Sequence, residues 1–345
     1  MSEGGRVSKP RRRHPPPDFH IPKGEKVFIH QAFRCCPYAG LITSKIHDFV
    51  ELNGYHVVDQ PALAAVQVIN TCGYKETRRH LAYDAIRTVR AENPSSPIVV
   101  AGCLTKIEPR EVKGALSGVE HQAILSPTEL EDLEVIFDHD LSSFEQTPTA
   151  FHKDRYTSVD PRVGLYQITV NTGCLGRCRF CAIRRAQGRP VSMPLEDVLA
   201  RVRRGLAEGH QDFFLAGSDI SVYGADIGLT VVDLLRALTD VDASALFNAE
   251  AFEPTGFFSR LDDLLPILAS GRFAWLVFPV QSGSQRILDR MRRTYDIDQT
   301  MDGIRRIKQA DPTIITCTDI IYGYEDETWD EFLLSVEVGR QFDFA

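Results

Sequence analysis

Residues 171–181 read Asn-Thr-Gly-Cys-Leu-Gly-Arg-Cys-Arg-Phe-Cys and place Cys174, Cys178 and Cys181 in a CxxxCxxC spacing directly after a strand candidate. Three thiolates on one loop can hold three irons of a [4Fe–4S] cluster and leave the fourth iron open. The open iron can chelate the amino and carboxylate groups of S-adenosylmethionine (SAM) and pass an electron into its sulfonium, which yields a 5′-deoxyadenosyl radical. A structural zinc loop is the alternative, but it usually needs a fourth protein ligand.

The chain that follows this loop alternates apolar strand candidates with amphipathic helix candidates, which is typical of a β/α barrel. In such a fold the residues that follow the strands share one face. The strand candidates are 163–171, 212–218, 245–254, 275–281 and 314–323, and the helix candidates are 194–208, 230–239, 284–292, 297–310 and 331–340.

A shorter alternation precedes the loop and predicts a small parallel α/β sheet, with strands at 27–29, 66–69 and 98–101 and helices at 42–52 and 76–92. Cys36, Cys72 and Cys103 each follow one of these strands. Open α/β sheets form their sites at the carboxyl edge, so we expect these three thiols to converge there. From their spacing alone, however, three buried free cysteines are the default interpretation.

Length and composition indicate two globular domains, because the chain has 345 residues of which 43% are hydrophobic. We expect a disordered, Pro- and Arg-rich tail at 1–24, an α/β domain at 25–140, a linker at 141–162 and the barrel at 163–345.

The same composition argues against a membrane or secreted protein. No apolar run is long enough to span a bilayer or to act as a signal peptide, and the eight cysteines favour metal binding in a reducing cytoplasm over disulfides. The net charge of −8 excludes a generally basic nucleic-acid binder but allows a local basic patch.

The motifs of both halves together resemble the methylthiotransferase family of radical SAM enzymes. Cys36-Pro37, Asn70-Thr71-Cys72-Gly73 and Ala101-Gly102-Cys103-Leu104 are similar to the three cysteine segments of that family's amino-terminal domain. The resemblance spans roughly residues 25–345 and continues in order through segments 180–183, 219–226, 279–284, 291–293 and 319–323.

This resemblance implies two [4Fe–4S] clusters, one on Cys174, Cys178 and Cys181 and an auxiliary one on Cys36, Cys72 and Cys103. It implies that one SAM methylates a sulfur held at the auxiliary cluster and that a second SAM is cleaved to the radical. The family's substrates are a tRNA adenosine or an aspartate of a ribosomal protein, and a reduced flavodoxin or ferredoxin-type protein would donate electrons. The sequence leaves the choice of substrate open.

Two other functions fit the same residues. A radical SAM enzyme could insert sulfur or modify a peptide without transferring methyl, and an iron–sulfur protein could bind without catalysis. Deoxyadenosine formed together with S-adenosylhomocysteine would indicate methylthiolation and would separate it from both.

Contacts with SAM are expected from the superfamily resemblance and from strand ends on the barrel's upper face. The expected residues are Phe180, Gly217, Ser218, Glu253, Gln281 and Ser282. Ordinary roles are the alternatives: a core position for Phe180, helix caps and turns for the strand-end residues, and a solvated carboxylate for Glu253.

Several positions depart from the family pattern. Arg184, Gln187-Gly188 and Ser192-Met193 stand where the family has proline, Arg-Gly and Ser-Arg, and residues 323–328 read Gly-Tyr-Glu-Asp-Glu-Thr in place of Gly-Phe-Pro-Gly-Glu-Thr. Cys35 beside Cys36 leaves the identity of the first ligand open, and Cys317 in an apolar strand is expected to be a core residue.

The count of strands indicates a partial (β/α)6 barrel, because only five strand candidates precede residues 341–345, an apolar turn that resembles the start of a sixth strand. The family also has a carboxyl-terminal RNA-binding domain, for which the sequence has no counterpart. We therefore expect either a truncated gene product or a member that holds its substrate without that domain and covers its barrel edge with a partner chain.

Overall fold

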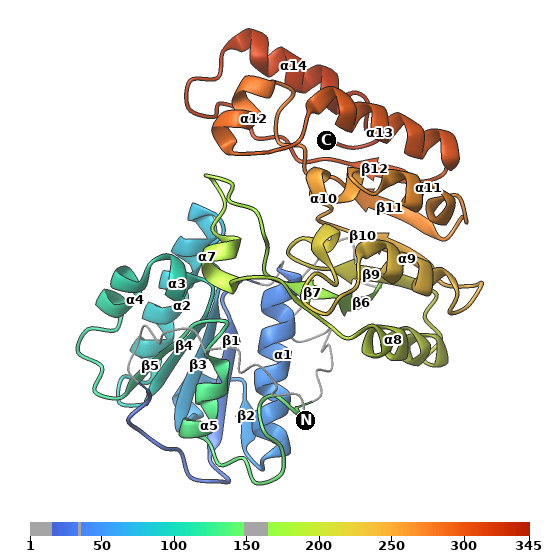
Figure 1. The fold of residues 1–345 in the computed structure, drawn as a ribbon. Coiled ribbons are helices and arrows are strands. Elements are labelled where there is room, and N and C mark those ends of the chain that lie inside the picture. Colours follow the sequence, from blue (N-terminus) through green and yellow to red (C-terminus); the bar gives the residue numbers. More distant parts are fainter. Residues whose placement is uncertain (1–15, 34–35, 148–164) are drawn as a thin grey trace, which may run out of the picture. The chain divides into compact units, whose positions relative to one another are not determined.

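The computed structural model describes residues 16–33, 36–147 and 165–345, and the chain divides into two compact units (Figure 1). The first comprises residues up to 34 together with 39–150, and the second comprises 35–38 together with 151–345. Most of the expected tail and linker, and Cys35, lie outside the described residues. The predicted domain boundaries stay a prediction.

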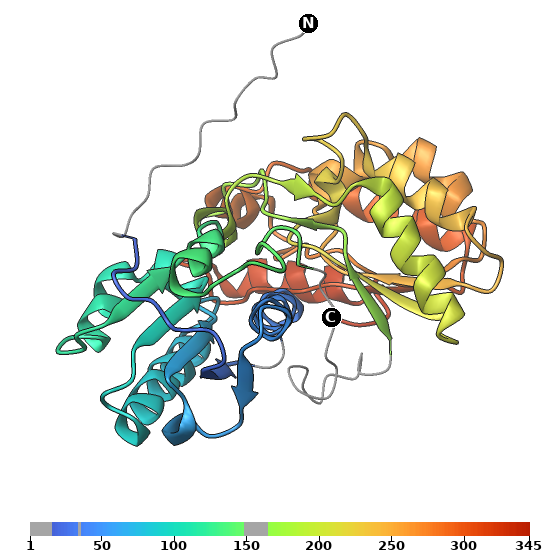
Figure 2. The ribbon, with the colours of Figure 1, turned by 90° about the horizontal axis from the view of Figure 1, so that it is seen from below.

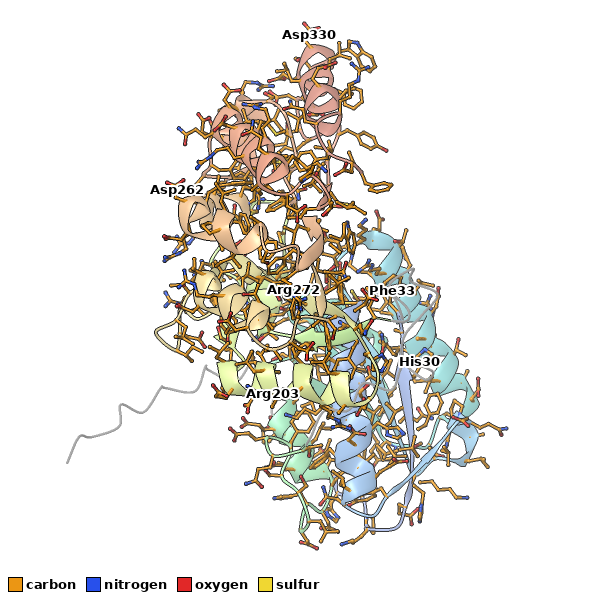
Figure 3. All side chains as sticks on the ribbon, turned by 90° about the vertical axis from the view of Figure 1, so that its right-hand side faces the viewer. His30, Phe33, Arg203, Asp262, Arg272 and Asp330 are labelled. Carbon is orange, nitrogen blue, oxygen red and sulfur yellow. The ribbon has the colours of Figure 1, made fainter. Side chains whose placement is uncertain are left out.

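The first unit contains a five-stranded parallel sheet in the order β2-β1-β3-β4-β5. His30 in β1 and Phe33 beyond its carboxyl end are labelled in Figure 3. The strands are β1 Lys26–Gln31, β2 His56–Val58, β3 Val66–Thr71, β4 Ile98–Gly102 and β5 Gln122–Leu125, and the helices are α1 Pro37–Leu52, α2 Glu76–Glu92, α3 Leu104–Ile107, α4 Pro109–Ala115 and α5 Leu133–Ile136.

The central strands of this sheet are buried along their whole length because both faces of a parallel sheet are covered. Every residue of β3 and β4 is buried, and Ile86 and Val89 of α2 belong to the same core cluster as Ile69 and Val100. The predicted strands and helices of this region are confirmed, and α2 has the predicted bounds. The short strands β2 and β5 at the two edges were not predicted.

The second unit contains a five-stranded parallel sheet in the order β12-β11-β10-β9-β6 and a small antiparallel hairpin, with helices packed against the sheet (Figures 1 and 2). The strands are β6 Tyr166–Thr169, β7 Asn171–Thr172, β8 Val191–Ser192, β9 Asp212–Ala216, β10 Leu246–Ala249, β11 Phe273–Val277 and β12 Ile315–Cys317. The helices are α7 Ile183–Gln187, α8 Leu195–Ala207, α9 Val231–Thr239, α10 Pro254–Phe258, α11 Leu261–Leu268, α12 Gln285–Met291, α13 Ile297–Ala310 and α14 Trp329–Gly339.

All five predicted barrel strands are confirmed, although each is shorter than its apolar run. Helix α13 shows why the helix predictions succeeded. Its buried residues Ile297, Met301 and Ile304 repeat at helical spacing, and Asp296 caps its first turn by accepting from the backbone N–H of Gln299 at 2.9 Å. The helical spacing of the apolar residues and the capping residue Asp296 therefore predict the same helix.

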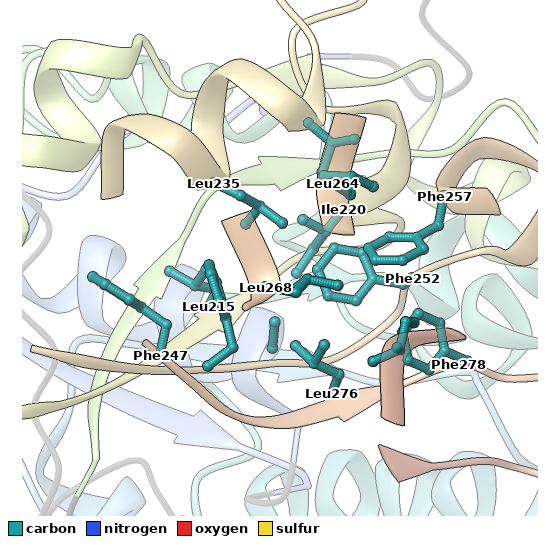
Figure 4. Close-up of a cluster of buried hydrophobic side chains, with 14 of the residues drawn as sticks. Leu215, Ile220, Leu235, Phe247, Phe252, Phe257, Leu264, Leu268, Leu276 and Phe278 are labelled. Atoms are coloured by element: carbon teal, nitrogen blue, oxygen red, sulfur yellow. The ribbon is translucent and has the colours of Figure 1, made fainter. Parts of the chain in front are cut away.

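Phenylalanine rings pack among leucine and isoleucine side chains in the core of the second unit (Figure 4). Phe252 lies 4.7 Å from Phe257, and Phe257 lies 4.9 Å from Phe278 in an edge-to-face arrangement, measured between ring centroids. All three rings are fully buried. Such aromatic pairs add about 0.5–1.5 kcal/mol to the burial of their surface, so this cluster gives the strand ends a rigid support.

The last residues of the chain run beside β12, as the expected start of a sixth strand requires. Phe344 forms a parallel bridge with Cys317, and the backbone N–H of Thr318 donates to the Phe344 carbonyl at 2.9 Å. Cys317 is buried, as expected, whereas Phe344 is 65% exposed. Covering of this edge by a partner chain stays a prediction.

None of the described helices has both the length and the apolar character that a membrane crossing requires.

Candidate metal centres

The loop that carries Cys174, Cys178 and Cys181 runs from β7 to α7, and the β7–β8 hairpin fixes its start. Gly173 has φ of +77°, and a Cβ there would lie 2.1 Å from the carbonyl oxygen of Arg189. The N–H of Cys174 donates to the carbonyl of Gly188 at 3.3 Å. Only glycine fits this turn, which places the first cysteine beside the return strand.

The loop forms a cradle around its sulfur atoms. A Cβ at Gly176 would lie 3.2 Å from Cys174 Sγ and 3.6 Å from Cys178 Sγ, so a side chain there would crowd the first sulfur and contact the second. The N–H of Gly176 donates to Cys174 Sγ at 3.1 Å, and that of Ile183 donates to Cys181 Sγ at 3.5 Å. Such bonds favour the thiolate form that iron binds.

Burial opposes the thiolate form. It raises the pKa of Cys174 to about 12, with a further contribution from the Asp219 carboxylate, and it also raises the pKa of Cys181. A bound cation reverses this effect because it stabilises the deprotonated sulfur directly. A bound cluster would therefore deprotonate Cys174 and Cys181, which burial alone keeps as neutral thiols.

Arg293 supplies positive charge to the same loop. Its Nη1 donates to Cys178 Sγ at 3.4 Å and lies 3.7 Å from Glu253 Oε1, and its Nη2 donates to the Pro279 carbonyl at 2.6 Å. The side chain is 6% exposed. Burial lowers the pKa of Arg293, but its neighbours Tyr295, Glu253 and Cys178 outweigh burial and raise it, so this arginine stays charged.

Asp219 is the buried acid of the site. The Cys174 thiol donates to Asp219 Oδ2 at 3.6 Å, and burial, followed by the nearby Glu253 charge, raises the pKa of Asp219 to about 6. Its backbone carbonyl accepts from Asn171 Nδ2 at 2.6 Å. Asp219 thus joins the end of β9 to the strand that leads into the cysteine loop.

Gly217 and Ser218, both expected at the SAM site, lie against the cysteine loop. A Cβ at Gly217 would lie 2.2 Å from Asn171 Oδ1, and the Ser218 hydroxyl donates to Gln187 Oε1. Gln187 Oε1 also accepts from the Gly173 N–H at 3.2 Å. Sequence reasoning gave Gln187 no role except as a departure from the family. Its amide oxygen links the loop to the end of β9.

Glu253 is the N-cap of α10. Its Oε2 accepts from the Gly256 N–H at 3.2 Å, its Oε1 accepts from the Thr255 hydroxyl at 3.2 Å, and its side chain is 19% exposed beside Arg293. The Glu253 carboxylate thus caps a helix and pairs with Arg293 in a partly buried position. This differs from the alternative interpretation of Glu253 as a solvated carboxylate. Its contact with SAM stays a prediction.

Gln281 and Ser282 lie where β11 passes into the turn before α12. Gln281 has φ of +77°, and its N–H donates to the Asp319 carbonyl at 2.8 Å. Ser282 is fully buried, with its Oγ 3.3 Å from Ser335 Oγ in α14. The Ser282 hydroxyl therefore ties the turn to α14. Binding of SAM by these two residues stays a prediction.

The tip of the cysteine loop contacts the loop after β12. Phe180 and Tyr324 meet edge to face with centroids 6.4 Å apart, and Arg179 Nη1 lies 3.5 Å from Glu325 Oε1. The Arg179 N–H donates to the Met291 carbonyl at 3.0 Å. Phe180 is partly buried by this contact, which the sequence could not reveal because Tyr324 lies far along the chain.

Two of the auxiliary cysteines lie side by side in the first unit. Cys72 and Cys103 follow β3 and β4, whose last residues Thr71 and Gly102 are paired, and the Cys103 N–H donates to the Thr71 carbonyl at 3.1 Å. Cys72 is 4% exposed. Gly102 has φ of +99°, and a Cβ there would lie 2.3 Å from the Thr71 carbonyl oxygen, so the close approach requires glycine.

Cys36 directly precedes α1, whose first turn is fixed at the same sheet edge. Asn70 Nδ2 donates to the Ala39 carbonyl and to Thr43 Oγ1, both at 2.8 Å. Residues 35–38 group with the second unit, however. Convergence of Cys36 with Cys72 and Cys103 therefore stays a prediction.

No three His, Cys, Asp or Glu side chains among the described residues converge closely enough to hold a single metal ion. A [4Fe–4S] cluster does not need such convergence, because each of its thiolates binds a different iron. Cys174, Cys178 and Cys181, with their N–H···S bonds and the space kept open by Gly176, fit a cluster of this kind.

Comparison with known proteins identifies relatives of both units. The Radical SAM superfamily matches residues 168–338, and a family described as Uncharacterized protein family UPF0004 matches residues 33–122.

Among curated proteins, the chain is 29% identical over 275 residues to a probable threonylcarbamoyladenosine tRNA methylthiotransferase of Methanothermobacter thermautotrophicus, a match that covers 78% of this chain and 64% of that protein. It is 30% identical to the ribosomal protein uS12 methylthiotransferase RimO of Alkalilimnicola ehrlichii, covering 88% and 69%. It is 27% identical to the threonylcarbamoyladenosine tRNA methylthiotransferase of Homo sapiens, covering 96% and 58%. The chain thus spans about two thirds or less of the length of these relatives.

Solved structures share the fold at low identity. The radical SAM methyltransferase TsrM of Kitasatospora setae, with tryptophan and a SAM analogue bound, superposes with a TM-score of 0.66 at 15% identity, covering 93% of this chain and 73% of that one. The cobalamin-dependent radical SAM enzyme OxsB gives a TM-score of 0.60 at 13% identity, covering 92% and 52%. The α/β architecture predicted for both halves is confirmed.

Proposed function

This chain belongs to the methylthiotransferase family of radical SAM enzymes, whose cofactors are [4Fe–4S] clusters and SAM, and we propose that it adds a methylthio group to an unactivated C–H carbon of a macromolecule. One observation carries the proposal. A single chain combines the cysteine loop of the second unit with cysteines placed after adjacent parallel strands of the first. A radical generator alone would need only the loop.

The residues of the chain hold and orient the reacting groups. When bound, the clusters and SAM supply the electron transfer, the hydrogen abstraction and the methylthio group. Cys174, Cys178 and Cys181 would hold the radical-generating cluster, and Arg293 would balance the charge of its thiolates. The auxiliary cluster would be held by Cys36, Cys72 and Cys103. Neither the methylation of the sulfur nor the removal of hydrogen from the substrate needs a protein general base.

We propose RNA, and tRNA first, as the substrate. Residues 171–194 contain five arginines and no acidic residue, in a chain whose net charge is −8. Arg177, Arg179, Arg185 and Arg189 are exposed around the cysteine loop. A local positive field of this kind attracts phosphates even when the whole protein is acidic. Relatives of both kinds, acting on tRNA and on a ribosomal protein, are similar to this chain.

The remaining parts of the proposal follow from the chemistry of the clusters. A reduced flavodoxin or ferredoxin-type protein would deliver the electron to the radical cluster. Reduced thiols that bind clusters require a reducing compartment, so we place the protein in the cytoplasm. The runner-up function is a radical SAM enzyme that inserts sulfur or modifies a peptide without methyl transfer.

The decisive experiment combines product analysis with mass spectrometry. The reconstituted, reduced protein should form both deoxyadenosine and S-adenosylhomocysteine from SAM. RNA and small ribosomal proteins are then compared between cells with and without the gene. We expect a mass difference of one methylthio group in tRNA. A shift only in a ribosomal protein would refute the RNA proposal, and deoxyadenosine without S-adenosylhomocysteine would favour the runner-up.

A further inference from the structure

Arg78 in α2 points its guanidinium at one of the auxiliary cysteines. Its Nη1 donates to Cys72 Sγ at 3.8 Å, within the range of a hydrogen bond to sulfur. The guanidinium carbon lies 4.1 Å from the ring centroid of Phe33 and 5.2 Å from that of Tyr74. All four residues belong to the first unit.

The two rings fix the orientation of this charge. Phe33 lies in the connection after β1, where Figure 3 labels it, and Tyr74 lies in the connection after β3. Arginine stacks on aromatic faces, whereas lysine carries a compact charge on a flexible stem. Arg78 therefore joins the connection after β1 to the connection that carries Cys72, through a planar guanidinium with several N–H donors.

We propose that Arg78 is a positioning residue of the auxiliary site, which sets the charge beside Cys72 and thereby favours the reduced state of the auxiliary cluster. The inference rests on the proposed assignment of Cys72 as a ligand. Thiolate ligands make a cluster site negative, and hydrogen bonds to their sulfurs tune its reduction potential. Cys72 is 4% exposed and Arg78 is partly buried, so solvent screens their interaction less than it would at an open surface.

The test uses a full-length background in which Cys174, Cys178 and Cys181 are alanines, so that the remaining iron reports the auxiliary site alone. R78Q and R78K are compared with R87Q, which removes an exposed arginine of the same helix paired with Asp84. The midpoint potential is measured by a redox titration followed by electron paramagnetic resonance. R78Q should shift the potential to more negative values because a positive charge is lost, R78K should shift it less, and R87Q should leave it unchanged.

A second measurement keeps the inference testable if the triple-alanine background does not assemble. In the protein with all cysteines intact, R78Q should lower methylthio product about tenfold, as the loss of a residue that supports a metal ligand typically does, and should leave deoxyadenosine formation unchanged. An unchanged midpoint potential in an R78Q variant with full iron content would overturn the inference. An equal fall of methylthio product and deoxyadenosine would overturn it too. Loss of the Cys36, Cys72 and Cys103 thiols without loss of iron would instead overturn the ligand assignment itself.

Discussion

The candidate radical triplet, Cys174, Cys178 and Cys181, follows the antiparallel hairpin strand β7, whereas the candidate auxiliary triplet, Cys36, Cys72 and Cys103, follows the carboxyl ends of three parallel strands. The first lies within residues 174–181 on one loop, whereas the second is distributed over residues 36–103 and three strands. A loop of this kind carries its ligand spacing in its own sequence. Ligands that come from separate strands depend on sheet order and register, so the sequence around each one says little about the others.

The supports of the two sites are nevertheless alike. Each has a buried asparagine, Asn70 in β3 or Asn171 in β7, whose side-chain oxygen faces a glycine, Gly102 at the end of β4 or Gly217 directly after β9. A Cβ at Gly102 would lie 2.4 Å from Asn70 Oδ1, and one at Gly217 would lie 2.2 Å from Asn171 Oδ1. Each also has an arginine that donates to a cysteine sulfur. Similar constraints therefore hold two sites of different construction.

The largest expected effects come from removing the two triplets separately. Alanine at Cys174, Cys178 and Cys181 should halve the iron and sulfide content and abolish deoxyadenosine formation. Alanine at Cys36, Cys72 and Cys103 should also halve the iron content, and it should abolish methylthio product while slow cleavage of SAM persists.

Iron analysis and chromatography of the SAM products measure both outcomes. If the second variant retains all its iron, the auxiliary cluster is refuted, and if it still makes methylthio product, its cysteines have only a structural role. Cys35→Ala is the matched control and should keep the full iron content. Loss of a cluster from that control would move the ligand assignment from Cys36 to Cys35.

The next effect concerns the arginine of each site. Arg293→Gln removes the ion-pair partner of the partly buried Glu253 carboxylate. We expect this loss to lower the free energy of unfolding by about 3 kcal/mol. The substitution should also slow deoxyadenosine formation about tenfold. Both products should fall together, because the radical is needed before methylthio transfer. Arg78→Gln should lower only the methylthio product. Denaturant unfolding and product analysis of the two variants would show whether the sites are independent, and a selective loss of methylthio product in the Arg293 variant would contradict the assignment.

The sequence predicted the radical loop and most of its supporting strands because their signals are local. CxxxCxxC, the capped period of α13 and the bounds of α2 need no knowledge of the rest of the chain. The edge strand β2 has only three residues, from His56 to Val58, too few for a period to be recognised. The stacking of Arg78 on Phe33 was beyond prediction, since it joins a helix to a connection that follows another strand.

The roles of Glu253 and Ser282 show a second limit. Both residues lie in the connections after β10 and β11, and their place on the predicted site face predicts contacts with SAM, which stay a prediction. Glu253 caps α10 and pairs with Arg293, and Ser282 contacts Ser335 of α14, so tertiary neighbours decide what each side chain does. Such partners are far apart in the chain and leave no local pattern.

The close approach of β3 and β4 offers a smaller test of the auxiliary site. Gly102→Ala places a Cβ 2.3 Å from the Thr71 carbonyl oxygen at a φ of +99°, whereas Gly118→Ala places one in open space at +80°. Both variants carry the backbone strain, so their difference isolates the steric clash. We expect Gly102→Ala to cost about 2 kcal/mol more in unfolding free energy. Equal losses in denaturant titrations would mean that the strand ends have room to separate.

The smallest expected effect concerns whether the radical loop needs support from distant residues. Glu325 bridges two arginines, with Oε1 3.5 Å from Arg179 Nη1 and Oε2 2.9 Å from Arg290 Nε. These are exposed ion pairs, each of which contributes about 1 kcal/mol at most. Glu325→Gln should therefore leave the free energy of unfolding within about 1 kcal/mol of that of the unsubstituted protein and slow deoxyadenosine formation by about twofold to fivefold. The matched control is Glu337→Gln, which breaks the exposed pair between Glu337 and Arg340. Hydrogen exchange gives a more direct readout, because the Arg179 N–H donates to the Met291 carbonyl at 3.0 Å and should exchange faster once the bridge is lost. If exchange and rate are the same in both variants, the loop holds its shape unaided, and the contrast between a self-contained radical site and a distributed auxiliary site becomes sharper.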